Sequence, residues 1–121
     1  MSENRVIIAG SRSVEYSNHI LNTVKNILSS LDNVEVVSGT ARGADLVGER
    51  IAKELGLPVK KFPANWKEFG SSAGKIRNKE MADYSTHLIL IWDGSSSGSK
   101  NMLEIAKRQE LKVNIIKWYG N

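Results

Sequence analysis

Three short segments of this chain combine glycine, hydroxyl side chains and a cation, the residue types that hold phosphate groups in proteins. They read GSRS at residues 10–13, SGTARG at 38–43 and DGSSSGSK at 93–100. Glycine lets backbone N–H groups approach an anion, hydroxyls donate hydrogen bonds, and arginine or lysine supplies positive charge. Phosphate binding is the chemistry that we expect of them, although each segment taken alone is as typical of a tight turn.

The segments follow apolar runs, and such runs alternate with amphipathic stretches along the chain. RVIIA at 5–9 and LILIW at 88–92 are apolar at successive positions, as strands buried on both faces of a parallel sheet require. Apolar residues spaced three and four apart predict the intervening helices. The predicted strands are 5–9, 34–37, 59–62, 88–92 and 113–116, and the predicted helices cover 20–31, 47–55, 73–84 and 102–109, with an ordered loop or broken turn at 63–72. This order predicts an α/β fold with helices on both faces of a parallel sheet.

Loops that follow parallel strands leave the sheet at the same edge, where ligands bind in open α/β folds. The three segments should therefore meet there and form an anion-binding crevice. We expect its phosphate groups to be held by residues 39–43 and 94–99, with charge neutralised by Arg12, Arg42 and Arg77. The predicted ligand-binding residues are Gly10, Ser11, Arg12, Ser38, Gly39, Thr40, Arg42, Gly43, Asp45, Arg77, Asn78, Asp93, Gly94, Ser96, Gly98 and Ser99.

Several of these residues have two possible roles. Asp45 either favours the dipole of the helix that it opens or accepts a hydrogen bond from a ribose hydroxyl. Asp93 is either a turn cap or a magnesium ligand, and the cap is favoured because no second carboxylate has an identifiable position beside it. Trp66, Phe69 and Trp92 are expected in the core or the pocket wall, with base stacking as the alternative. No metal site is predicted, and SGTARG matches neither the G-x-G-x-x-G nor the P-loop motif.

Composition limits the class of protein. The 121 residues are expected to form one domain, and the absence of cysteine excludes disulfides and thiolate chemistry. A net charge of +4 favours anionic partners. No stretch is apolar enough to span a membrane and the N-terminus lacks a signal-peptide pattern, so a cytoplasmic protein without a membrane partner is expected.

The motifs IIAGSR, VVSGTARGAD, FPANW, AGKIRNKEMADYS and LILIWDGSSSGSKNM, in this order, resemble those of the YspA-like family of the SLOG superfamily. The resemblance extends from about residue 6 to 116. It implies a Rossmann-like three-layer sandwich with strand order 3-2-1-4-5, a bacterial or phage source, and a nucleotide or nucleotide-derived ligand, cyclic ones included. It also implies a homo-oligomer, for which the last predicted strand offers a pairing edge.

Two branches of that superfamily define the alternatives. LOG-type phosphoribohydrolases pair an arginine, matched here by Arg77, with a glutamate whose position is occupied by Met102. A thioether cannot act as an acid or base, and Glu104 faces about 200° away on a helix. The DNA-processing protein A family has an S-G-x-A-R-G-I-D loop similar to SGTARGAD and binds single-stranded DNA, but only single aromatic residues lie near these loops.

The function that we expect is thus the binding of a phosphorylated small molecule by a sensor, carrier or sequestering protein, with no catalytic residue and no certain cofactor. Cleavage of an N-glycosidic bond of a nucleotide is the first alternative. Binding of single-stranded nucleic acid is the second.

Overall fold

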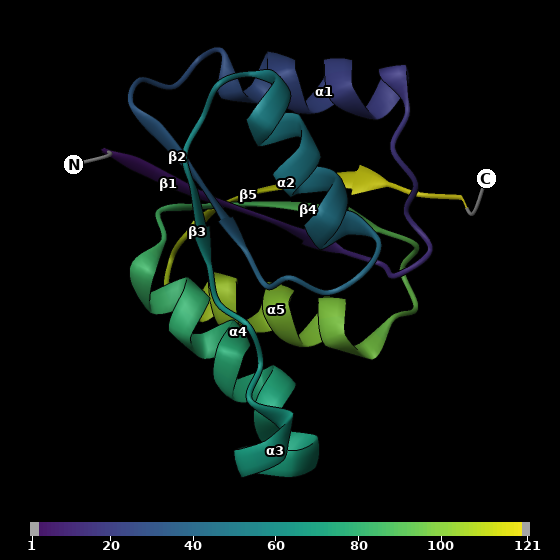
Figure 1. Cartoon of the computed structure of the whole chain (residues 1–121), viewed down its shortest axis with the longest axis vertical. Coiled ribbons are helices and arrows are strands. Elements are labelled where there is room, and N and C mark those ends of the chain that lie inside the picture. Colours follow the sequence, from purple (N-terminus) through teal and green to yellow (C-terminus); the bar gives the residue numbers. More distant parts are fainter. Residues whose placement is uncertain (1–2, 120–121) are drawn as a thin grey trace.

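The computed structural model describes residues 3–119, and its five strands form one parallel sheet in the order β3-β2-β1-β4-β5 (Figure 1). The strands are β1 (Asn4–Gly10), β2 (Val34–Ser38), β3 (Val59–Lys61), β4 (His87–Trp92) and β5 (Lys112–Lys117). The helices are α1 (Asn18–Leu28), α2 (Ala44–Glu54), α3 (Trp66–Phe69), α4 (Ala73–Tyr84) and α5 (Ser97–Arg108). The predicted fold class and strand order are confirmed.

The sheet separates two apolar cores. Val6 and Ile8 of β1 pack on the side covered by α1 and α2, whereas Ile7 and Ala9 pack on the side covered by α4 and α5 (Figure 1). Side chains alternate between the two faces of a strand, so a continuous apolar run supplies both cores at once. The runs at 5–9 and 88–92 therefore lie in the central strand β1 and its neighbour β4, where both faces are covered.

Two segments differ from the sequence expectation. The apolar pattern predicted a helix as far as Leu31, but α1 ends at Leu28 with Ser29 as its cap. Leu31 continues the pattern because it packs against the same core from the turn that follows, where its N–H donates to the carbonyl of Leu28. The segment 63–72, expected as a loop or broken turn, contains α3 and a 3₁₀ turn, Gly70–Ser72.

Strand β5 forms one edge of the sheet and hydrogen-bonds to β4. The other edge is the short β3. Pairing of β5 with a second subunit stays a prediction. None of the helices in the described range 3–119 has the length and apolar character needed to cross a bilayer.

Gly48 lies where α2 packs closely on the sheet. A Cβ at this position would lie 2.7 Å from Cβ of Ile8, closer than real side-chain carbons approach. Glycine to alanine inside a helix ordinarily stabilises by about 1 kcal/mol. We expect Gly48→Ala instead to lower the free energy of unfolding by about 1–3 kcal/mol, because α2 must move off β1.

Urea denaturation of both variants and the wild type measures this effect. Gly98→Ala in α5 is the matched control, since no atom lies within 4 Å of its added Cβ, and its stability should be unchanged or raised. A Gly48→Ala protein more stable than the wild type would contradict the close approach of α2 to β1.

Candidate functional site

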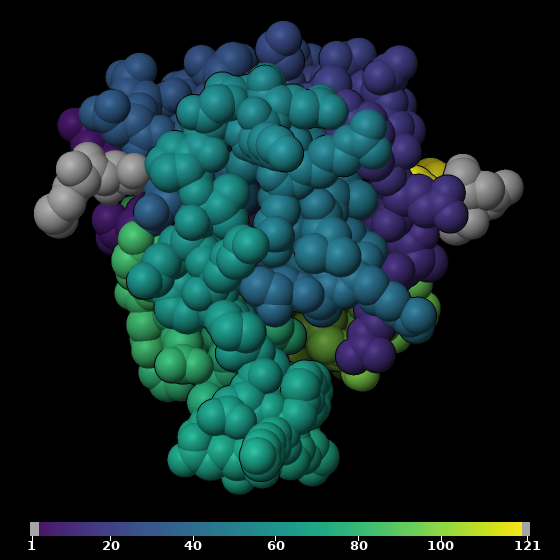
Figure 2. Space-filling view, viewed as in Figure 1, coloured from purple at the N-terminus to yellow at the C-terminus, as the bar shows by residue number. Residues whose placement is uncertain are grey.

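A cleft of about 1010 Å³ lies at the C-terminal edge of the sheet, between the loops that follow β1, β2 and β4 and the helices α4 and α5. Figure 2 shows it as a hollow between the teal α3 region and the blue and purple loops, with yellow-green atoms at its floor. Most of the predicted binding residues line it: Gly10, Arg12, Arg42, Asp45, Arg77, Asn78, Asp93, Ser96, Gly98 and Ser99. The others lie outside its lining: Ser11, Ser38, Gly39, Thr40, Gly43 and Gly94.

Ser11 and Gly43 bring the loops together instead of facing the cleft. The buried Ser11 hydroxyl accepts a hydrogen bond from the N–H of Asp93 at 3.0 Å, and its carbonyl accepts one from Ala44 N–H at 3.1 Å. Gly43 has φ +81°, and a Cβ there would lie 2.5 Å from the carbonyl oxygens of Ser11 and Arg12. Glycine is required here because the loops lie this close, and contact of Gly43 with a ligand stays a prediction.

In the loop after β2, two backbone N–H groups donate hydrogen bonds to nearby side chains of the protein. Thr40 N–H donates to the hydroxyl oxygen of Ser38 at 3.1 Å, and Ala41 N–H donates to Oδ2 of Asp45 at 3.1 Å. The Ser38 hydroxyl in turn donates to the carboxylate of Glu49 at 2.6 Å. These two N–H groups already have acceptors within the protein. That residues 39–43 hold a phosphate stays a prediction.

Asp45 and Arg77 hold this loop from two sides of the sheet. Nη1 of Arg77 donates to the carbonyl of Gly39, and its Nε donates to Oδ1 of Asn78 at 3.1 Å. A Cβ on Gly39 would lie 2.7 Å from both Nη1 of Arg77 and Oδ2 of Asp45, so only glycine leaves room for them. Burial raises the pKa of Asp45 to about 6 despite the opposing effects of the Ala41 N–H and the Arg77 charge. Burial also lowers the pKa of Arg77.

The opposite wall is organised by Asp93 and Asn78. Oδ1 of Asp93 accepts hydrogen bonds from the N–H groups of Ser95 and Ser96 at 2.8 and 3.0 Å, which lowers the pKa of this carboxyl. The turn-cap interpretation of Asp93 is thereby confirmed. Asn78 is buried and its Nδ2 donates to Oδ1 of Asn101 at 3.0 Å, which joins α4 to the start of α5.

Two arginines and one helix end remain available to an anion. Arg12 and Arg42 are exposed at the cleft, and neither guanidinium has a hydrogen bond or ion pair within residues 3–119. No side chain in this range caps the N-terminus of α5, whose residues Ser97, Gly98 and Ser99 line the cleft. The free N–H groups and dipole of such a helix end attract negative charge.

Several residues that line the cleft were not among the predicted binding residues. Gly74 and Met81 share a helix face with Arg77 and Asn78, because positions three, four and seven residues apart line up on a helix. That spacing around Arg77 was the signal that could have found them. The lining residues missed by the prediction also include Ser71, Lys75 and Asn101.

Met102, the residue that the sequence resemblance aligned with a catalytic glutamate, lies at the floor of the cleft. It is 1% exposed, belongs to the core between the sheet and α4 and α5, and reaches the cleft beside Met81. The floor of the cleft at this point is therefore apolar. Trp66 is 53% exposed and forms part of the cleft wall, whereas Phe69 is 43% exposed and lies neither in the core nor in the wall, contrary to expectation.

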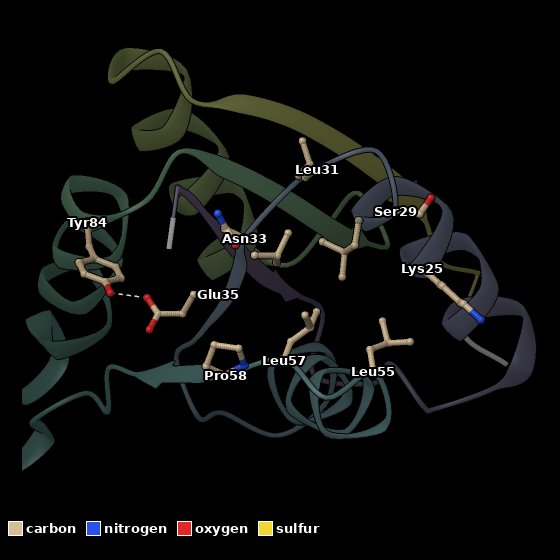
Figure 3. Close-up of a pocket in the computed structure, with 11 residues that line it drawn as sticks. Lys25, Ser29, Leu31, Asn33, Glu35, Leu55, Leu57, Pro58 and Tyr84 are labelled. Carbon is tan, nitrogen blue, oxygen red and sulfur yellow. Dashed lines mark hydrogen bonds between the residues drawn. The ribbon is translucent and has the colours of Figure 1, made fainter. Parts of the chain in front are cut away.

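A second pocket of about 790 Å³ lies at the other end of the sheet, and no predicted site residue lines it. Figure 3 shows Lys25 at one end and a hydrogen bond from the Tyr84 hydroxyl to Glu35 at the other, with Leu55, Leu57 and Pro58 along one side. Its lining is mainly apolar, so the cationic cleft at the C-terminal edge is the better candidate for a phosphorylated ligand.

The raised pKa of Asp45 predicts a pH-dependent stability. Its pKa moves from 3.8 to about 6, so between these values the folded chain holds a proton that the unfolded chain has released. This contribution to stability is complete below pH 4 and is lost as the pH rises through 6. Asp45→Asn keeps an oxygen for the Ala41 N–H but cannot ionise. We expect its free energy of unfolding to increase relative to wild type by up to about 3 kcal/mol between pH 4 and 7.

Urea denaturation across this pH range at constant ionic strength tests the expectation. Asp83→Asn is the control, because the hydrogen bond from Lys79 lowers the pKa of Asp83 and gives the opposite slope. A pH-independent difference between Asp45→Asn and wild type would show that the carboxylate is not held in a desolvated site.

Comparison with known proteins agrees with this geometry. Residues 4–69, more than half of the chain, match the model of the YspA, cpYpsA-related SLOG family. The structure is similar to the X-ray structure of DNA processing protein A (DprA) from Streptococcus pneumoniae, with a TM-score of 0.71 and 18% identity over 98% of this chain and 51% of that one. The chain thus spans about half the length of that protein, and the likeness concerns the fold. No curated protein sequence matches it. A sheet of this order, the loop sequence after its second strand and the family match lead to one conclusion: the chain belongs to the YspA, cpYpsA-related SLOG family.

Proposed function

We propose that the cleft at the C-terminal edge binds a nucleotide or nucleotide-derived ligand, cyclic ones included, and that the protein acts as a sensor, carrier or sequestering protein. One observation carries the proposal: Arg12, Arg42 and the uncapped N-terminus of α5 line one cleft, and neither guanidinium has a hydrogen bond or ion pair within the described residues. Two exposed guanidinium groups and a free helix end form an anion site. Membership of a SLOG family supports a nucleotide-related ligand.

The phosphate is assigned to the α5 side of the cleft. The N–H groups of Thr40 and Ala41 are occupied by side chains of their own loop, and those of Ser95 and Ser96 by Asp93. In our proposal the first turn of α5, residues 97–99, supplies backbone donors, because no side chain caps this helix end in the described chain. Arg12 and Arg42 then neutralise the charge from the facing loops, as bidentate donors suited to phosphate oxygens.

Binding without cleavage follows from the side chains at the floor. Hydrolysis of an N-glycosidic bond uses a carboxyl group near the sugar. By the sequence resemblance Met102 has the position of that carboxyl group, and its thioether, which lines the cleft, offers no proton. Asp45 is the buried carboxyl group of the cleft, and its Oδ2 accepts the Ala41 N–H of the adjacent wall. The ligand therefore remains intact in our proposal.

Ligand binding should raise the melting temperature. A nucleotide present at about 100 times its dissociation constant stabilises by about 2.7 kcal/mol, which corresponds to an increase of roughly 10 °C in a domain of this size. We expect Arg12→Ala and Arg42→Ala each to weaken binding by roughly 10- to 100-fold, because each removes a charge-assisted hydrogen bond. Differential scanning fluorimetry against a panel of mono-, di-, tri- and cyclic nucleotides finds the ligand, and calorimetry gives the affinities.

Arg108→Ala provides the matched control. Arg108 is exposed at the C-terminal end of α5, away from the cleft, so this variant loses the same net charge and should bind like wild type. Equal weakening by all three variants would mean that overall charge, and not the cleft, attracts the ligand. No shift with any nucleotide would refute the proposal.

The fate of the ligand separates binding from the alternatives. We expect nucleoside monophosphates to be recovered intact after prolonged incubation with the protein, as measured by chromatography of the free base. Released base would favour a phosphoribohydrolase. Affinity for a single-stranded oligonucleotide that exceeds affinity for mononucleotides and falls steeply with salt would favour the nucleic-acid-binding alternative.

A further inference from the structure

Helix α3 and the turn after it are ordered but contribute nothing to the core. Every residue from 65 to 72 is exposed, and α3 projects from the body of the molecule at the bottom of Figure 1. The helix nevertheless has a complete cap, because Oδ1 of Asn65 accepts the Glu68 N–H and its Nδ2 donates to the Glu68 carboxylate, both at 3.1 Å. Ordering a segment that buries no apolar side chain costs conformational entropy without a gain in the core. Its contribution must therefore be sought at the cleft.

Trp66 is the residue that α3 presents to the cleft. Its indole is 53% exposed and lines the wall near the first turn of α4, where a Cβ on Gly74 would lie 3.4 Å from Cη2 of the ring. Arg77 and Met81 continue along the same face of α4 into the cleft. The ring of Trp66 therefore lies beside Gly74, and the guanidinium of Arg77 follows one helical turn later on α4.

We propose that Trp66 is the stacking platform for the aromatic base of the ligand. This inference rests on the proposed function and deepens it, because it requires the ligand to carry a purine or pyrimidine ring and not only a sugar phosphate. An exposed indole in a cationic cleft offers a flat π surface, on which any base stacks. The phosphate lies at the N-terminus of α5, and the base lies against α3. Segment 65–72 is ordered because it holds this ring.

Phe69 supplies a control within the same helix. It is aromatic, 43% exposed and three residues from Trp66, but it does not line the cleft. A general effect of removing an exposed aromatic ring from α3 would appear in both variants. An effect of base stacking would appear at Trp66 alone.

The test compares the four nucleoside 5′-monophosphates with ribose 5-phosphate by isothermal titration calorimetry. We expect Trp66→Ala to weaken the tightest nucleotide by roughly 10- to 100-fold and to leave ribose 5-phosphate unchanged. Trp66→Phe should retain most of the affinity, and Phe69→Ala should behave as wild type. The melting temperature of the free protein should be the same in all variants, since the side chains are outside both cores.

The outcomes distinguish the two proposals. Ribose 5-phosphate binding as tightly as the nucleotides, or equal nucleotide affinity in Trp66→Ala and wild type, overturns base stacking and leaves the phosphate site in place. Failure of ribose 5-phosphate and of every mono-, di-, tri- and cyclic nucleotide to bind overturns the stacking proposal together with the proposed function. Nucleotide affinity lost equally in Trp66→Ala and Phe69→Ala also overturns it, because α3 as a whole and not the cleft-facing ring would then matter.

Discussion

The backbone of the loop after β2 is bound by two side chains that arrive from opposite faces of the sheet. Asp45 of α2 accepts the N–H of Ala41, and Arg77 of α4 donates to the carbonyl of Gly39. The glycine is needed because both side chains occupy the space where a Cβ would be. Through this loop the two helical layers are connected at the edge of the sheet where the cleft lies.

Holding a carboxylate and a guanidinium there has an electrostatic cost. Burial raises the pKa of Asp45 and lowers that of Arg77, so for both groups the loss of hydration outweighs their mutual attraction. Such a pair contributes geometry more than stability. In the loop that this pair holds, the N–H groups of Thr40 and Ala41 both have acceptors. Arg12 and Arg42 remain exposed.

A cleft built in this way has different chemistry along its length. Its lining includes the first turn of α5 and two exposed arginines, Arg12 and Arg42, which our proposal assigns to a phosphate. The floor at Met81 and Met102 is apolar, and the far wall carries the indole of Trp66. In our proposal the polar, apolar and aromatic surfaces of the cleft bind the charged end and the flat base of a nucleotide. The apolar pocket at the other end of the sheet has no comparable set of cations (Figure 3).

Much of the fold could be read from local patterns. Continuous apolar runs at 5–9 and 88–92 predicted the central strands, and the spacing over 73–84 predicted α4 with its observed bounds. Both predictions work because burial on one or two faces imposes a periodicity that survives in the sequence. The apolar pattern predicted the end of α1 incorrectly. Leu31 lies in the turn after the helix but packs on the same core, so its spacing looks helical.

The candidate site could be located but not built from the sequence. Parallel strands bring their loops to one edge, so residue types alone placed Arg12, Arg42, Arg77 and Gly98 in one cleft. Hydrogen-bond partners far apart in the chain decided the rest. Only folding brings Asp45 to the N–H of Ala41 and Gly43 to the carbonyl oxygen of Ser11. Only folding likewise leaves Trp66 exposed at the cleft and not in the core. The sequence by itself determined which groups gather at the edge, because chain direction and periodicity are local properties. Only the tertiary structure decided which of them are already satisfied by the protein and which are left for a ligand, because satisfaction is a property of neighbours in space.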